Sequence, residues 1–416
     1  MTTLRELCHL LGDQIHDRSR VKMVFRDMGM SLATLDLDGP PVDWWENALA
    51  LAYAANRTEG LFGHLREALP AYVTQIRLPT EWERREQALV PIPPGSLYEP
   101  AWDVGRHEVT EQVLSRARGT KATIVVVTPD GHGRTWFLRR IRARLQATET
   151  PRQFLELTEL VETPRQRDFF AAAVVSILRS AGRSPAEIAE AWNRKLPPAE
   201  NLRHTLRVEL NRTDQSTMLM VDVPNWIWSV PAAAPFFSLL RSLGNDTAPP
   251  WNRLQLLVGY STTPSLWKRD LKASPLNVDP ISLPDLSIAD VLTLAQRHGL
   301  LWTGQDLDRV HELLGGHPRL VQQLLFHCYE TRASVGAVLD RCHEYDGLFS
   351  THLSTLKSHL QEHQLEETLR HVAETGKGPD KVDDFQALHA AGFLRWEATR
   401  KQHVLRYGLL RHLLRP

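Results

Sequence analysis

Apolar residues in the first 70 positions recur at the three- and four-residue spacing of helices. Val21, Val24, Phe25 and Met28 would share one face of a helix that runs from about Ser19. The boundary signals of this segment are the Thr3–Glu6 capping box, Gly29 as a C-cap, Pro41 at a helix start and Pro70 after a last helix over Leu61–Leu69. We therefore expect an all-helical module over residues 1–70, too small to house a catalytic cleft of its own.

From residue 101 onward the pattern changes to short apolar runs that are separated by helical stretches. The runs are Ile124–Val127, Phe154–Leu157, Met218–Val221, Leu254–Val258 and Ile281–Leu283. Continuous apolar runs of this length that alternate with helices are typical of parallel strands buried on both faces. Residues 101–285 are therefore predicted to form an α/β core with a parallel sheet.

The segments on either side of this core have their own patterns. Residues 71–100 contain the proline-rich stretch PIPPG, which cannot continue a helix and indicates a linker. Residues 286–346 are predicted to be helical, opened by Ser287 with Asp290 three residues later. Residues 347–416 give helices followed by a hairpin within residues 393–407, which suggests a winged helix. The predicted fold class is thus multidomain, with all-α and α/β parts.

The bulk composition excludes several classes of protein. Lys and Arg total 49, as do Asp and Glu, so the net charge is +0 and no basic field drives nucleic-acid binding. Three cysteines cannot build a disulfide framework, which favours a reducing compartment. The sequence shows no signal peptide and no run of about 20 apolar residues that could span a membrane. We expect a cytoplasmic protein with no membrane partner.

The first predicted strand leads into the sequence TPDGHGRT at residues 128–135, which resembles the phosphate-binding loop GxxxxGK[ST]. In such a loop, backbone amides and the following helix N-terminus cradle phosphates. Gly131 and Gly133 supply glycines, and Thr135 keeps the hydroxyl that binds magnesium. Arg134 replaces the lysine and keeps the charge, but its planar fork cannot follow the phosphates as a compact ammonium does.

Neighbouring positions should further weaken the binding of phosphate by this loop. Pro129 removes a donor amide, and Asp130 places a carboxylate where phosphate should lie. The third strand ends at Asp222, the expected second magnesium ligand, but Val223 stands where an ATPase has an acid that orients water. Hydrolysis should therefore be slow or absent.

An alternative interpretation is a glycine-rich turn that binds no phosphate, with Asp222 as a strand-end cap. The order of the two motifs, on strands one and three of an α/β pattern, favours the fold of a P-loop NTPase.

Three segments together resemble the bacterial AAA-like domain family of STAND-type signalling NTPases. They are Val104–Arg106 before the first strand, LQLLVGYSTTPS in the fourth strand, and LLGGHPRLVQQLLFH in the lid; the likeness covers roughly residues 95–416. The resemblance implies that residues 286–346 form a helical lid, that Pro318 packs on an adenine, that ATP or ADP with Mg²⁺ is the cofactor, and that a winged helix follows. Arg134 and Val223 resemble the inactive branch of these proteins.

The first 70 residues are similar to the effector-associated domain of the first type, a death-fold-like adaptor. The likeness rests on FRDMGMSLATLDLDG, on Trp45 and on RTEGLFGHLREALP. It implies that residues 1–70 recruit an effector, such as a protease, through a matching adaptor domain. Homo-oligomers are also compatible with this adaptor.

Other groups of residues give weaker evidence for a functional site. His327, Cys328, Cys342 and His343 lack the spacing of a zinc site. Trp226 and Trp228 favour core packing over a partner surface. The C-terminal basic residues are interpreted as a solvated face, so a nucleic-acid partner is not expected; they are Arg395, Arg400, Lys401, Arg406, Arg411 and Arg415.

The sequence therefore predicts a regulatory or scaffold pseudo-NTPase of a bacterial conflict system, either antiphage defence or programmed cell death. Two alternatives stay open. One is an active ATP-hydrolysing switch in which Arg134 serves in place of lysine. The other is a DNA-binding AAA-type protein that uses its winged helix.

Overall fold

The computed structural model describes most of the 416 residues. The described residues are all except 1–3, 29–34, 36, 55–57, 73–75, 77–90, 92, 97, 120, 149–150, 159, 161, 263–275, 378–381, 398–400 and 415–416. The chain divides into two compact units. The first comprises residues 1–93, 292–304 and 325–335, and the second comprises residues 94–291, 305–324 and 336–416.

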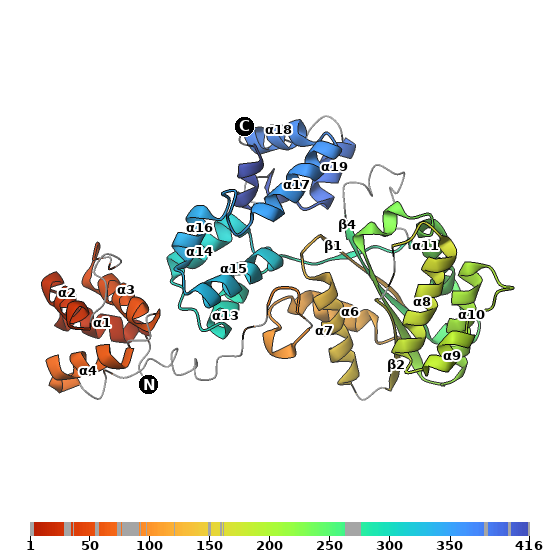
Figure 1. Ribbon diagram of the computed structural model, residues 1–416, viewed down its shortest axis with the longest axis horizontal. Coiled ribbons are helices and arrows are strands. Elements are labelled where there is room, and N and C mark those ends of the chain that lie inside the picture. Colours follow the sequence, from red (N-terminus) through yellow and green to blue (C-terminus); the bar gives the residue numbers. More distant parts are fainter. Residues whose placement is uncertain are drawn as a thin grey trace. The chain divides into compact units, whose positions relative to one another are not determined.

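The N-terminal segment is helical, as its periodicity predicts (Figure 1). Its helices are α1 (Leu4–Gln14), α2 (Arg18–Asp27), α3 (Pro41–Ala54) and α4 (Thr58–Ala68), with a short 3₁₀ turn η1 (Pro70–Tyr72). Their inner faces share one apolar cluster around Phe25, Trp45 and Phe62, each of which is fully buried. Pro41 opens its helix as expected, whereas Thr3 and Gly29 lie outside the described residues, so the capping box and C-cap stay predictions.

Five strands of the second unit form the predicted parallel sheet. They are β1 (Thr123–Pro129), β2 (Arg152–Leu157), β3 (Ser216–Val223), β4 (Leu254–Thr262) and β5 (Ile281–Ser282), in the order β2-β3-β4-β1-β5. The register aligns Asp222 of β3 with Gly259 of β4, and Gly259 with Val126 of β1. The ends of the central strands β3, β4 and β1 therefore lie side by side at one edge of the sheet.

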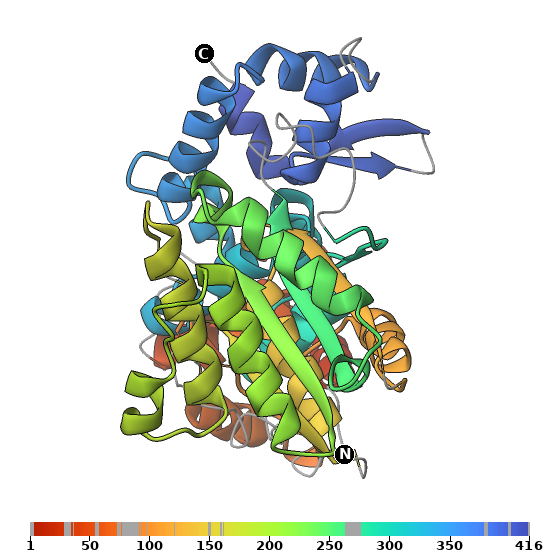
Figure 2. The same ribbon diagram turned by 90° about the vertical axis from the view of Figure 1, so that its right-hand side faces the viewer.

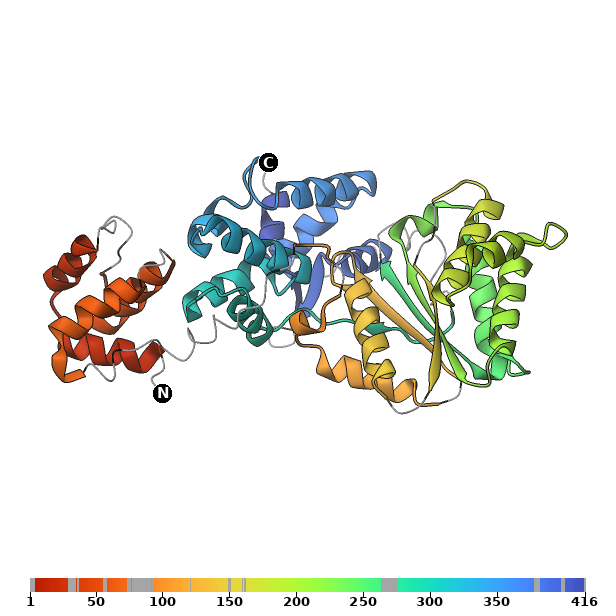
Figure 3. The same cartoon turned by 60° about the horizontal axis from the view of Figure 1, so that its bottom comes forward.

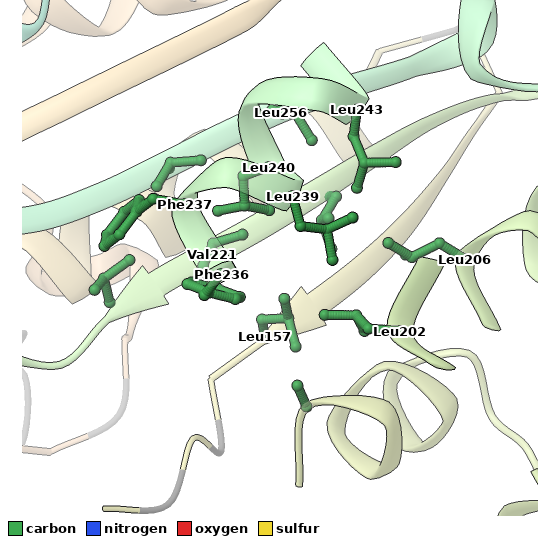
Figure 4. Close-up of a cluster of buried hydrophobic side chains, with 14 of the residues drawn as sticks. Leu157, Leu202, Leu206, Val221, Phe236, Phe237, Leu239, Leu240, Leu243 and Leu256 are labelled. Atoms are coloured by element: carbon green, nitrogen blue, oxygen red, sulfur yellow. The ribbon is translucent and has the colours of Figure 1, made fainter. Parts of the chain in front are cut away.

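Helices cover both faces of this sheet, as continuous apolar strands require (Figure 3). One face packs on α6 (His107–Arg116) and α7 (Arg134–Gln146). The other packs on α8 (Gln166–Ser180), α10 (Pro198–Asn211) and α11 (Ala233–Asn245), through the leucine- and phenylalanine-rich cluster of Figure 4. The connecting elements are η2 (Pro100–Trp102), α9 (Pro185–Glu190), η3 (Asn225–Ser229) and η4 (Trp251–Arg253).

Lys121, just before β1, fastens the end of α11 to the sheet. Its ammonium donates to the carbonyl oxygens of Leu243 at 2.8 Å, Asp246 at 2.7 Å and Trp251 at 2.8 Å. Burial lowers the pKa of Lys121, so the three carbonyls offset part of the cost of placing its charge there.

We expect Lys121→Met to lower the free energy of unfolding by about 2–4 kcal/mol, because three carbonyls lose a charged donor. Urea unfolding measures this loss. Lys195→Met removes an exposed lysine and should change stability by no more than about 0.5 kcal/mol. Equal losses in the two variants would contradict this role of Lys121.

The C-terminal third is helical and ends in a hairpin, as its sequence predicts (Figure 2). The helices are α13 (Ile288–Arg297), α14 (Gly304–Leu314), α15 (Pro318–Thr331), α16 (Val335–Arg341), α17 (Ser350–Glu362), α18 (Glu366–Thr375) and α19 (Val382–Ala390). The antiparallel strands β6 (Leu394–Glu397) and β7 (Gln402–Leu405) precede η5 (Gly408–Leu414). Ser287 and Asp290 cap α13 reciprocally, which confirms that predicted helix start.

No helix of the described residues is long and apolar enough to cross a lipid bilayer.

Candidate functional site: a P-loop that is closed on itself

The glycine-rich turn connects the end of β1 to α7, where a phosphate-binding loop belongs. Gly131 and Gly133 have φ of 75° and 76°, in the left-handed region that glycine adopts without strain. A Cβ atom at Gly131 would come within 2.9 Å of the imidazole of His317, so close packing also requires glycine there. The residues between Pro129 and Arg134 therefore form the tight turn that the sequence predicts.

The first turn of α7 points unpaired amides at this loop. The amide of Phe137 donates to the carbonyl of Gly133 and begins the helical bonding. The amides of Gly133, Arg134 and Thr135 have no hydrogen-bond partner among the described residues. Such amides at the N-terminus of a helix attract an anion, since they add to the positive end of the helix dipole.

The side chains of the site bind one another. Arg134 Nε donates to Asp222 Oδ1 at 2.6 Å, and Arg134 Nη1 donates to the hydroxyl of Ser261 at 2.6 Å. The hydroxyl of Thr135 donates to Asp222 Oδ2 at 2.5 Å. The side chains of Arg134 and Asp222 are 13% and 12% exposed, so this is a largely buried ion pair. The two predicted motifs therefore meet, and the arginine at the lysine position neutralises the carboxylate of β3.

Gly259, in the middle of β4, makes room for this arginine. A Cβ atom at position 259 would lie 3.0 Å from Cδ and 3.1 Å from Cγ of Arg134. Glycine inside a strand often marks the close approach of another group. The aliphatic stem of Arg134 thus lies across the backbone of β4, with its guanidinium between the ends of β3 and β4.

The weak positions around the motif have structural explanations. Val223 is fully buried in the apolar cluster beneath α8 and α11, so no acidic group follows Asp222 on this strand. The side chain of Asp130 is exposed. Pro129 packs against the C-terminal region, because a Cβ at Gly392 would lie 2.7 Å from the Cβ of Pro129.

Comparisons with known proteins identify the family of the chain and support its fold. The model of the family described as "AAA-like domain" matches residues 98–415, about three quarters of the chain. The chain belongs to the AAA-like domain family. No curated protein matches it.

Solved structures resemble the AAA-like chain in fold. The Walker-type ATPase paby2304 of Pyrococcus abyssi has 12% sequence identity and a TM-score of 0.55, covering 79% of this chain and 99% of its own. The Aeropyrum pernix ORC2 protein, in its ADPNP–ADP complexes, has 14% identity and a TM-score of 0.47, covering 79% of this chain and 96% of its own. The first of these supports a P-loop ATPase fold for the AAA-like core.

The lid of the AAA-like domain reaches the loop through the GGHP turn. A Cβ at Gly133 would lie 4.0 Å from that of Pro318, so the proline that the family pattern singles out flanks the loop. The amide of Arg319 donates to the carbonyl of Gly131 at 3.3 Å. The structure thus brings together Gly131, Gly133, Arg134, Thr135, Asp222 and Pro318.

A buried cluster of polar side chains lies behind the loop. His132 is 2% exposed, and its Nε2 lies 3.2 Å from Asp285 Oδ1. Arg406 donates to the same carboxylate through Nε at 2.9 Å and Nη2 at 3.0 Å. The rings of His132 and His317 are 4.2 Å apart between centroids. His352, 5.6 Å from His317, hydrogen-bonds the hydroxyl of Tyr407 at 2.9 Å.

This cluster joins the P-loop to the C-terminal helices of the AAA-like chain. Arg106, which precedes α6, donates to the carbonyls of His132 at 2.7 Å and Pro284 at 3.1 Å. The hydroxyl of Thr262, at the end of β4, donates to the carbonyl of Ala390, the last residue of α19. The loop is therefore held by both the lid and the C-terminal region.

Protonation should weaken this cluster. Burial lowers the pKa of His132 and of His317, and it lowers the pKa of His352 to about 4. The cationic groups that face the three rings are Arg406 and Arg319, and the facing carboxylates are Asp285 and Asp130. Asp285 stays ionised throughout, because His132 and Arg406 hold its pKa at about 2 although burial opposes them.

Unfolding returns each histidine to its usual pKa of about 6.5, so the unfolded chain binds more protons below that pH. The stability that neutral histidines contribute is complete above about pH 6.5 and declines toward about pH 4. We expect the melting temperature to fall by several degrees between pH 7 and pH 5, measured by scanning calorimetry. His352→Gln, which keeps a hydrogen-bonding partner for Tyr407, should flatten this slope; an unchanged slope would contradict the assignment.

Sequence reasoning missed Ser261, Gly259 and Asp285. Its interpretation of Arg406 as part of a solvated face is wrong, because this side chain is 14% exposed and is paired with Asp285. A glycine inside an apolar strand was the available signal for Gly259. Asp285 and Arg406 are 121 residues apart and carry no local pattern.

The other sequence candidates do not join this site. Trp226 packs on Phe169, and Trp228 stacks on Phe237, which agrees with core packing. His343 stacks on His412, and Cys328 and Cys342 are buried. Among the described residues, no group of three or more His, Cys, Asp or Glu side chains could hold a metal ion.

Proposed function

We propose that the AAA-like core is a nucleotide-binding regulatory module that binds ATP or ADP without turning it over. The observation that carries this proposal is the bonding of Arg134 to both Asp222 and Ser261. The loop still offers three unpaired amides to a phosphate. Two groups that active P-loop enzymes use for hydrolysis are replaced here, since arginine stands at the lysine position and the position after Asp222 is a buried valine.

Calorimetric titration of the full-length protein with ATP and with ADP tests this proposal, with phosphate release followed in the same samples. We expect heat of binding with both nucleotides and turnover at least about a thousandfold below a common enzymatic rate of about 10 s⁻¹. Thr135→Val removes a hydroxyl bound to Asp222 and serves as a comparison for binding. Rapid phosphate release would establish an active switch instead. Absence of heat would show that the protein does not bind nucleotide and that the proposal is wrong.

In the same proposal, the N-terminal module recruits an effector of a bacterial conflict system through a matching adaptor domain. Its support is the sequence likeness of residues 1–70 and their own apolar core. The outer face of α2 is exposed and basic, through Arg18, Arg20, Lys22 and Arg26, and it carries Met23 at 52% exposure. Exposed apolar groups rimmed by charge are common in protein interfaces.

A binding assay between the full-length protein and an adaptor-bearing effector encoded beside it tests this part. Met23→Glu should weaken binding at least tenfold, because it places a charge in the contact. Val208→Glu alters an exposed apolar residue of α10 in the AAA-like core and should leave affinity unchanged. Equal affinity for the native protein and Met23→Glu would remove α2 from the interface.

A further inference from the structure

The carboxylate that should hold magnesium in a P-loop protein is already neutralised by a fixed cation. Arg134 occupies Asp222 Oδ1 at 2.6 Å, and the hydroxyl of Thr135 occupies Oδ2 at 2.5 Å. Thr135 keeps an oxygen lone pair, but Val223 supplies no second carboxylate. Magnesium demands near-octahedral oxygen ligation and binds carboxylates and phosphates. A dication bound at Thr135 and Asp222 would have a guanidinium as its immediate neighbour, so the residues present do not fit this metal.

The guanidinium cannot easily leave this position. Its stem lies in the space that the absent side chain of Gly259 provides, and Ser261 holds a second nitrogen at 2.6 Å. Arginine holds Asp222 and Ser261 through two different nitrogens of a rigid planar fork, whereas all the donors of a lysine lie on one nitrogen. Three elements of the core, β3, β4 and α7, therefore shape the site around Arg134.

One nitrogen of the Arg134 guanidinium is left for a ligand. Nε and Nη1 are engaged, while Nη2 has no partner among the described residues. The unpaired amides of Gly133, Arg134 and Thr135 belong to the same turn. A phosphate oxygen in this loop would therefore meet amides and a guanidinium that is already in place.

We propose that this site binds its nucleotide without magnesium, and that Arg134 takes the place of the metal by offsetting the charge of Asp222 and by donating to a phosphate oxygen through Nη2. This inference rests on the proposed nucleotide binding, and it concerns the metal requirement of that binding. The ligand is metal-free ATP or ADP. Because Asp222 is paired within the protein, its charge does not repel the phosphates.

Two kinds of variant distinguish magnesium-free nucleotide binding from binding that depends on magnesium. In Arg134→Met the internal cation is lost and Asp222 faces the phosphates, so affinity for metal-free ATP should fall at least about tenfold. Added Mg²⁺ should then restore part of that affinity. In Asp222→Asn the negative charge beside Arg134 is lost while an oxygen acceptor remains, so affinity for metal-free ATP should stay equal or rise. Arg144→Met, which removes an exposed charge near the other end of α7, is the matched control.

The test is calorimetric titration of the full-length protein with ATP, once in excess MgCl₂ and once in excess EDTA. The proposal predicts dissociation constants that agree within about threefold for the native protein, a difference of less than about 0.7 kcal/mol. Binding that requires Mg²⁺ would overturn the inference and leave the proposed function standing. Absence of binding in both conditions would overturn the proposed function itself. Should Arg134→Met not fold, Ser261→Ala, which removes one anchor of the guanidinium, should raise the dependence on Mg²⁺; no change in it would count against the proposal.

Discussion

Asp222→Ala should lower the free energy of unfolding by about 3–5 kcal/mol, because it leaves the charge of Arg134 largely buried without a partner. The hydroxyl of Thr135 loses its acceptor in the same variant. In a P-loop protein whose carboxylate waits for a metal, removal of the carboxylate would relieve repulsion and leave stability unchanged or higher. The sign of the change therefore distinguishes a carboxylate that holds the fold together from one that awaits magnesium.

A double-mutant cycle measures the coupling energy between Arg134 and Asp222, because the double variant leaves no buried charge without a partner. Replacing both partners, Arg134→Met with Asp222→Leu, should cost much less than the sum of the single variants, with a coupling energy of about 2–3 kcal/mol. Denaturant unfolding followed by tryptophan fluorescence suits the measurement, since Trp226, Trp228 and Trp251 pack in or against the core cluster next to β3 and β4. Additive losses would show that the two side chains do not act as a pair.

The second large effect is expected at Gly316, in the GGHP turn that places His317 and Pro318. A Cβ atom there would lie 2.0 Å from the carbonyl oxygen of Leu286, and φ is 75°. The carbonyl of Gly316 accepts the amide of Leu286 at 2.9 Å, so the two segments cannot separate without losing this bond. We expect Gly316→Ala to destabilise the protein by about 4 kcal/mol or more, at the upper end of single substitutions.

Gly182 provides the matched control, because it has nearly the same φ of 72° but open space around its Cβ position. Gly182→Ala should cost only the backbone strain, about 1–2 kcal/mol. The difference between the two variants in urea unfolding isolates the steric clash with Leu286. Similar losses at both positions would mean that the turn relaxes, and that close packing does not fix the lid against the loop.

The parallel sheet could be predicted because its strands are short, continuous and apolar, which is the pattern of burial on both faces. The motif positions were also predictable, since Thr135 lies in the first turn of the helix after the first strand and Asp222 lies near the end of the third. What Arg134 does could not be foreseen. The sequence indicates that this arginine is a poor substitute for lysine. Its bonds to Asp222 and Ser261 depend on strand order and register, because these partners lie 88 and 127 positions further along the chain.

The cluster around His132 shows the same limit. No local spacing connects it with Asp285, His317 and Arg406, which come from different segments of the second unit. The sequence indicates only that proline at position 129 removes a donor amide, whereas in the structure this proline packs where Gly392 approaches the loop. Long-range packing decides such roles, and pattern alone carries no information about it.

A single-turnover experiment tests the central claim most directly. The full-length protein, in excess over ATP, is incubated for hours, then denatured, and the released nucleotide is separated by chromatography. The account predicts that the nucleotide is bound during incubation and recovered as intact ATP, because the site lacks the lysine and the acid of an active P-loop. Recovery of ADP and phosphate in stoichiometric amounts would contradict it and would establish Arg134 as part of a working ATPase.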